Sequence, residues 1–184
     1  VISGLGTATP YDVVRFTPDN PGVYPLGSGT YSWEWRGKPN GLTTAAEKID
    51  AFTIDWGDYL FSTAGAAALP TSPVIKAADE DLLVWPTWAG GWNHVGLDGS
   101  TIPGLAAEDI NGVASDWDTG DIYVTILGPF NLGGVTGDGK SIVRLNPNGG
   151  SVWNSNTQWT PSLVPWLAPG ATFPSTIDAI EVAR

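Results

Sequence analysis

One alternating pattern of apolar and polar positions recurs along this chain. The first copy covers residues 49–65, with a turn at Trp56-Gly57-Asp58, and the second covers residues 110–128, with a turn that ends at Gly120. Short runs rich in Val, Ile, Thr, Tyr and Trp that are bounded by Gly and Asp are typical of strands joined by hairpin turns. Both copies are therefore predicted to be β-hairpins.

A third copy of the pattern is divided between the two ends of the sequence. Residues 177–182 repeat the start of the first copy, and residues 1–6 resemble its second strand. A repeat divided in this way is complete when the last strand pairs beside the first, so the chain is predicted to close into a ring. Closure within one chain and closure between two chains both fit this pattern.

Two more strands are predicted in every copy, so each repeat forms a four-stranded unit. They are residues 81–85 and 91–95, residues 141–145 and 150–153, and residues 12–16 and 30–35. The units then cover approximately residues 49–95, residues 110–153, and residues 177–184 together with 1–35. The predicted fold class is all-β, as a single domain of residues 1–184 with three units around a pseudo-threefold axis. The arrangement is propeller-like or prism-like and is closed by pairing of the N- and C-terminal strands.

Helical signals are short. Residues 43–48 and 105–109 are each predicted to form one helical turn that leads into a repeat. The 24 Gly and 15 Pro residues separate the strands and leave no long amphipathic segment.

Charge excludes two classes of partner. The chain has 19 acidic and 8 basic residues, a net charge of −11, so phosphate backbones and anionic membrane surfaces would repel it. No apolar run approaches the roughly 18 residues that a membrane-spanning helix needs, which argues against membrane insertion. Cys and Met are both absent.

Catalytic chemistry has few candidates in this sequence. The single histidine, His94, is not accompanied by a Gly-x-Ser-x-Gly nucleophile motif, and it is interpreted as a surface or edge-strand residue. The acidic clusters Asp79-Glu80-Asp81 and Glu108-Asp109 are interpreted as solvated turn residues and caps. We expect no catalytic residues, no enzyme activity and no cofactor.

One segment has the composition of a calcium loop. Residues 116–121 carry three aspartates within six positions, but the complete EF-hand pattern is absent. A hairpin turn is the favoured interpretation and no metal site is predicted, with calcium left open as the alternative.

The ten tryptophans are the remaining chemical signal. Trp33, Trp92, Trp153 and Trp85 recur at equivalent strand positions and are expected to pack in the core. Five others are the candidate partner- or ligand-binding residues: Trp56 and Trp117 at the hairpin tips, Trp159 and Trp166 in a proline-rich insertion, and Trp88. Exposed tryptophans anchor protein interfaces and stack on sugar rings.

The repeated segments resemble propeller-type short β repeats of secreted bacterial proteins and of tailed-phage structural proteins. Residues 49–65 with 79–85, and residues 108–128 with 141–145, carry this resemblance, and residues 177–182 with 1–16 complete it as a third copy split across the termini. It implies a repeat architecture and specifies no active site.

Two classes of function follow. The favoured one is a non-enzymatic structural protein of a virus particle, a bacteriophage capsid decoration or cement protein on the virion surface that bridges shell subunits. Three similar units would match a threefold site of such a shell. The alternative is a secreted or cell-surface binding module that recognises a glycan or a protein through its tryptophan-bearing loops.

Overall fold

Two four-stranded antiparallel sheets form the centre of the computed structural model, which describes residues 4–21, 28–148 and 157–164. The first sheet contains β3 (Ile49–Asp55), β4 (Asp58–Thr63), β7 (Leu82–Pro86) and β8 (His94–Leu97). The second contains, in the same order, β9 (Ile110–Asp116), β10 (Asp121–Ile126), β13 (Ile142–Pro147) and β14 (Trp159–Leu163). A separate two-stranded sheet is formed by β1 (Asp12–Pro18) and β2 (Gly29–Arg36). The all-β prediction and both predicted hairpins are confirmed.

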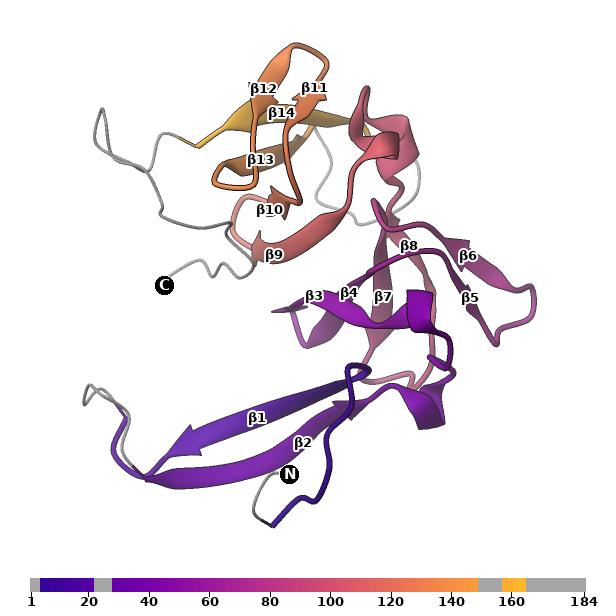
Figure 1. Cartoon of the computed structure of the whole chain (residues 1–184), viewed down its shortest axis with the longest axis vertical. Helices are drawn as coiled ribbons and strands as arrows, with labels where there is room; N and C mark the ends of the chain where they lie inside the picture. The colour runs from indigo at the N-terminus through magenta and orange to yellow at the C-terminus, as the bar shows by residue number, and fades with distance from the viewer. Residues whose placement is uncertain (1–3, 22–27, 149–156, 165–184) are drawn as a thin grey trace.

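The three sheets follow one another along the long axis of the molecule, with the β1–β2 hairpin at one end (Figure 1). The first strands of the two four-stranded sheets, β3 and β9, pack against each other. Strand β9 is buried along almost its whole length, because it lies between β10 and β3. Its small residues Gly112, Ala114 and Ser115 allow this close approach.

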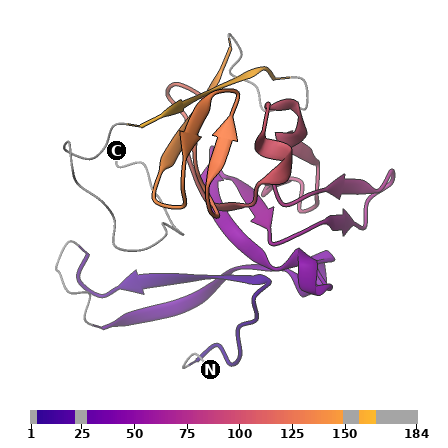
Figure 2. The ribbon, with the colours of Figure 1, turned by 45° about the horizontal axis from the view of Figure 1, so that its top comes forward.

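Each four-stranded sheet carries an additional short hairpin between its second and third strands. These hairpins are β5 (Ala67–Leu69) with β6 (Ile75–Ala77), and β11 (Phe130–Leu132) with β12 (Val135–Gly137). Figure 2 shows the β5–β6 hairpin extending away from its sheet. The sequence analysis did not predict them, because strands of three residues are too short to show a clear alternation.

Short 3₁₀ turns connect the sheets. The predicted helical turns are confirmed as η2 (Ala45–Glu47) before β3 and η4 (Leu105–Ala107) before β9. Two further turns, η1 (Lys38–Asn40) and η3 (Gly99–Thr101), follow β2 and β8. Within the described residues no helix is long and apolar enough to cross a membrane.

Equivalent hydrogen bonds occur at the ends of β2 and β8. The Asp12 carboxylate, at the start of β1, accepts the backbone N–H of Gly37 at 3.2 Å. The Asp81 carboxylate, immediately before β7, accepts the backbone N–H of Gly99 at 2.8 Å. The β1–β2 hairpin and the β7–β8 hairpin are therefore joined to the following 3₁₀ turn in the same way.

The contacts between successive sheets also match. The N–H of Ile49 donates to the carbonyl of Pro10 at 2.9 Å, and the N–H of Ile110 donates to the carbonyl of Asp79 at 3.2 Å. The first bond links β3 to the chain that precedes β1, and the second links β9 to the chain that precedes β7. Residues 1–3 and 177–184, which the ring-closure prediction requires, lie outside the described residues. The described part of the strand predicted at residues 1–6 is not a strand, because Gly4 and Leu5 form a turn in which Gly4 has φ 82°.

The fourth strand of the second sheet differs from the prediction. It was expected at residues 150–153, which lie outside the described residues, whereas the strand beside β13 is β14. Its residues had been assigned to a proline-rich insertion. Strand β14 lies at the edge of its sheet, where Pro161 is tolerated although it lacks an N–H.

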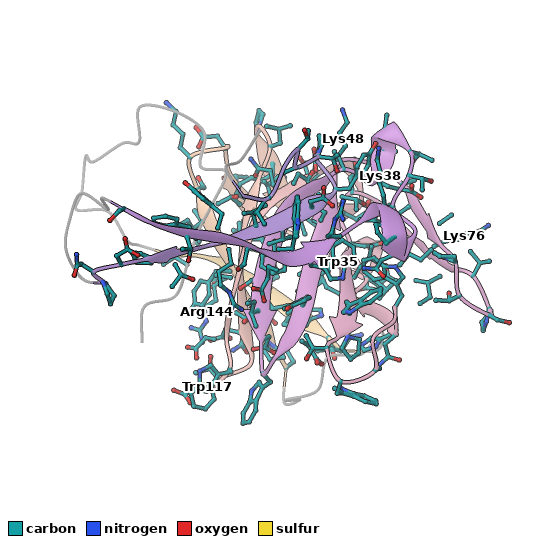
Figure 3. All side chains as sticks on the ribbon, turned by 90° about the horizontal axis from the view of Figure 1, so that it is seen from below. Trp35, Lys38, Lys48, Lys76, Trp117 and Arg144 are labelled. Atoms are coloured by element: carbon teal, nitrogen blue, oxygen red, sulfur yellow. The ribbon has the colours of Figure 1, made fainter. Side chains whose placement is uncertain are left out.

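The core beneath the β1–β2 hairpin is aromatic. Trp35 packs on Phe61, Trp85 and Trp92 with ring centroids 4.6–5.4 Å apart, and Trp35 is central in the view of Figure 3. The expected burial of Trp85 and Trp92 is confirmed. The expected core role of Trp33 is wrong, since this residue is half-buried. A β-bulge at Val13/Val14 separates the partners of the two β2 tryptophans, and Trp35 is the one packed on the first sheet.

Candidate functional site: a tryptophan surface at the hairpin turns

The turn between β3 and β4 displays Trp56. Asp55 and Asp58 pair across a two-residue loop, in which Trp56 has φ 50° and Gly57 has φ 86°. Positive φ at both central residues defines a type I′ turn, whose right-handed twist matches that of the strands. Trp56 is 78% exposed, so its ring is not accommodated by its own hairpin.

The turn between β9 and β10 is longer and displays Trp117. Asp116 accepts the backbone N–H of Asp118 on Oδ1 at 3.0 Å, and its carbonyl accepts the N–H of Gly120 at 2.7 Å. Gly120 has φ 73°, a conformation that closes the loop and that glycine adopts at low cost. The hairpin interpretation of this segment is confirmed.

The two hairpin tips lie side by side. The ring of Trp117 contacts that of Trp56, with centroids 5.3 Å apart and planes at 85°. This edge-to-face geometry follows from the packing of β3 on β9, which brings the turns of both sheets to the same end of the molecule. The sequence analysis identified both residues, but it did not predict that they meet.

Trp88 belongs to the same end of the first sheet. It lies in the loop between β7 and β8, where the Thr87 hydroxyl donates to the carbonyl of Gly57 at 2.6 Å. The backbone of Thr87 also hydrogen-bonds to Asp58. These two bonds fix the loop against the β3–β4 turn and leave Trp88 81% exposed. We call Trp56, Trp88 and Trp117 the tryptophan surface.

The carboxylates around this surface have different environments. Partial burial raises the pKa of Asp58, although a backbone hydrogen bond and the nearby charge of His94 act in the opposite direction. Asp121 is almost fully buried, and burial alone would raise its pKa. Hydrogen bonds from Arg144, Thr119 and Asn146 outweigh burial and lower the pKa of Asp121.

The calcium alternative at residues 116–121 gains no support. Asp121 accepts the Arg144 guanidinium at 2.8 Å and the Asn146 amide at 2.6 Å, so its oxygens are engaged. Within the described ranges no group of three His, Cys, Asp or Glu side chains is arranged to hold a metal ion.

The candidate Trp159 does not join this surface. Trp159 is half-buried on β14 and packs against the core of the second sheet, so its expected exposure in a loop is wrong. Trp159 pairs with Pro147 of β13, so its backbone is part of the second sheet. Trp153 and Trp166 lie outside the described residues.

A second group of carboxylates lies at the opposite ends of β3 and β9. Burial, together with the charge of Asp109, raises the pKa of Asp50 to about 8, and burial also raises that of Asp109. The two carboxyl groups interact with each other, and the charge of Asp79 acts on Asp109. Burial and this like charge favour the protonated form of Asp50 at the junction of the sheets.

The acidic clusters of the sequence are less solvated than expected. Glu80 and Asp81 are buried, which contradicts the interpretation as solvated turn residues. The capping role is confirmed for Asp81, whose carboxylate accepts the N–H groups of Ala78 and Gly99, both at 2.8 Å. Burial raises the pKa of both Glu80 and Asp81.

His94, the residue that any triad would require, is half-buried on β8 opposite Val84. Its charge acts on Asp58, opposing the larger effect of burial that raises the Asp58 pKa, so it lies near the β3–β4 turn.

No protein-family model, no curated protein and no solved structure matches this chain. The function proposed below is therefore based on the geometry of the site.

Proposed function

We propose that this protein is a non-catalytic structural component of a larger assembly and that it binds a neighbouring protein through the tryptophan surface. The observation that carries the proposal is the contact between Trp56 and Trp117 at the tips of two hairpins, with Trp56 and Trp88 largely exposed. Large exposed aromatic side chains that gather in one place are characteristic of interface anchors.

The conformation of Trp56 supports a role in binding. Among the described residues it is the one non-glycine residue with positive φ, and the left-handed region costs an ordinary side chain about 1 kcal/mol. Asn is preferred at the first position of a type I′ turn. A bulky, exposed ring at this position is therefore unfavourable for the fold, and strain of this kind is concentrated at functional sites.

A virus shell is the assembly that we propose, with the protein as a capsid decoration at the virion surface. The support is indirect and comes from the repeated units. Three similar units could make similar contacts around a threefold position, which suits a protein that bridges shell subunits. We propose both the relation of the repeats to phage structural proteins and the location at the virion surface.

The three-unit architecture is also part of the proposal. The matching bonds of Asp12 with Gly37 and of Asp81 with Gly99 support β1–β2 as the outer half of a third unit. In the described residues β1 pairs only with β2, whereas its counterparts β7 and β13 each pair with two strands. Residues 177–182 are the proposed inner strand, since the described residues 4–6 of the other predicted strand contain a turn. Deletion of residues 177–184 should then unfold the protein, and an unchanged melting temperature would reject the third unit.

Glycan recognition by a secreted or cell-surface module is the second candidate. The exposure of the Trp88 ring favours it, because an accessible indole face can stack on a sugar.

The test is binding of variants to the native assembly. Particles that contain this chain are isolated from the native source, with mass spectrometry used to follow the chain, and are then stripped of it. Wild-type protein and the variants Trp56→Asn, Trp88→Ala and Val74→Asn are added, and the bound fraction is measured by sedimentation. Val74 is the matched control, an exposed apolar residue between β5 and β6.

The proposal predicts that wild type and Val74→Asn rebind equally and that both tryptophan variants bind more weakly. Trp56→Asn should melt at or above the wild-type temperature, which separates loss of binding from loss of fold. Equal rebinding by all variants would reject the tryptophan surface. A chain that is free and monomeric in its native source would reject the assembly.

A further inference from the structure

The tryptophan surface carries negative charge. The two turns, residues 55–58 and 116–121, contain five aspartates and no basic residue. Asp58 and Asp116 are half-buried and Asp118 is exposed, so these three contribute charge at the rim of the surface. Two basic side chains act on this group: Arg144 of β13 is engaged with Asp121, and His94 of β8 acts on Asp58.

Several other basic residues in the described part of the chain lie away from this end. Figure 3 shows Lys38 and Lys48 at the edge of the molecule opposite Trp117, and Lys76 at a third edge. Arg15 forms an ion pair with Glu34 on the β1–β2 hairpin. These basic side chains therefore do not neutralise the negative charge of the tryptophan surface.

Indole rings and carboxylates together favour a cationic guest. A guanidinium or ammonium group placed over a Trp ring is attracted by the electron density of the ring face, and Trp is the most effective side chain for this contact. The edge-to-face packing of Trp117 on Trp56 leaves the Trp56 ring 78% exposed. Elsewhere the protein makes such contacts itself, with the Arg36 guanidinium 4.7 Å from the ring centroid of Trp33.

We propose that the tryptophan surface receives arginine side chains of a basic protein segment. The guanidinium groups stack on Trp56 and Trp88 while the carboxylates of Asp58, Asp116 and Asp118 provide the counter-charge. Arginine is favoured over lysine because its planar group stacks on an aromatic face and binds carboxylates with two hydrogen bonds at once. This inference rests on the proposed function and specifies the chemistry of the partner.

The experiment uses a defined probe with the full-length protein. The peptide acetyl-Arg-Gly-Arg-Gly-Arg-amide is titrated into ¹⁵N-labelled protein, and the indole N–H signals of the tryptophans are followed by NMR. The control peptide replaces each arginine by citrulline, which retains the shape and hydrogen-bonding amide but has no charge. The titration is repeated with Trp56→Asn, with the double variant Asp116→Asn/Asp118→Asn, and with Val74→Asn.

The inference predicts saturable shifts of the Trp56 and Trp88 indole signals with the arginine peptide and none with the citrulline peptide. Trp56→Asn and the double aspartate variant should each weaken binding about three- to tenfold, and Val74→Asn should not change it. Raising NaCl from about 20 mM to about 300 mM should weaken binding further, because the surface charges become screened. The Asp116→Asn change keeps an acceptor for the Asp118 N–H, so the turn is retained.

Two results would overturn the inference. One is the absence of indole shifts with the arginine peptide, and the other is an equal response to both peptides. Either result leaves the sedimentation test of the proposed function intact, since an apolar or glycan partner could still require Trp56. Failure of the sedimentation test, in contrast, removes the basis for both.

Discussion

Asp50 and Asp109 are interacting carboxyl groups at the junction between the two four-stranded sheets. Asp50 is the second residue of β3 and Asp109 directly precedes β9, so the interaction lies between the first strands of both sheets. Burial and the charge of Asp109 raise the pKa of Asp50 to about 8, which favours its protonated form. The junction is therefore sensitive to pH.

Stability should fall as pH rises from acid to weakly alkaline values. The pKa of Asp50 is about 8 in the folded protein, against about 3.9 for an unfolded aspartate. Between these values the folded chain holds a proton that the unfolded chain has lost, so the contribution of this group is complete below about pH 4 and is lost as pH approaches 8. Thermal unfolding measured from pH 4 to pH 9 tests this dependence.

Asp50→Asn isolates the contribution of the pair. An amide can donate to Asp109 without titrating, so the variant should melt at a higher temperature than wild type at pH 8 and should show a flatter pH dependence. Asp19→Asn, the same side-chain change at an exposed position, is the control. If both variants follow the wild-type pH profile, the raised pKa of Asp50 does not contribute to the pH dependence of stability.

Two glycines should be intolerant of a side chain. A Cβ at Gly99 would lie 2.3 Å from the Glu80 carbonyl oxygen, and a Cβ at Gly37 would lie 2.2 Å from that of Tyr11. Gly99→Ala and Gly37→Ala should each reduce the free energy of unfolding by about 1–3 kcal/mol, because the backbone must move.

Gly91→Ala is the matched control for these glycines. It lies in the β7–β8 loop with no atom within 4 Å of the added Cβ, and its φ is outside the positive range. It should change stability by less than about 0.5 kcal/mol. Urea titration of the three variants measures the difference, and equal effects at Gly99 and Gly91 would contradict the close packing of η3 on the chain before β7.

Core and surface tryptophans should differ sharply in their contribution to stability. Trp35→Ala removes the ring that joins the β1–β2 hairpin to the first sheet, and loss of a buried Trp costs about 3–5 kcal/mol. Trp88→Ala removes a ring that is mostly in solvent, and it should cost less than about 0.5 kcal/mol. Denaturant unfolding of both variants distinguishes the two roles. A large loss for Trp88→Ala would assign it to the core.

Local features of this fold were predictable from the sequence, whereas contacts between units were not. The alternation of residues 49–65 and 110–128 predicted both hairpins, and Trp56 and Trp117 were placed correctly at their tips. Their contact depends on the packing of β3 on β9, which a local pattern does not specify. The burial of Trp35 in place of Trp33 likewise depends on where the β1–β2 hairpin crosses the first sheet. Strand β14 was missed because Pro161 weakens the strand signal, although an edge strand accepts it.

Oxidative footprinting tests the tryptophan surface most directly. The chain contains no Cys or Met, so tryptophan is the principal target of hydroxyl radicals, and each site can be quantified by mass spectrometry. In the free protein, Trp56 and Trp88 should oxidise rapidly and Trp35 and Trp92 slowly, in line with their exposure. In the native assembly, the account predicts that Trp56, Trp88 and Trp117 are protected while the core tryptophans are unchanged. Equal oxidation of Trp56 and Trp88 in the free and assembled protein would contradict the claim that this surface is where the protein binds.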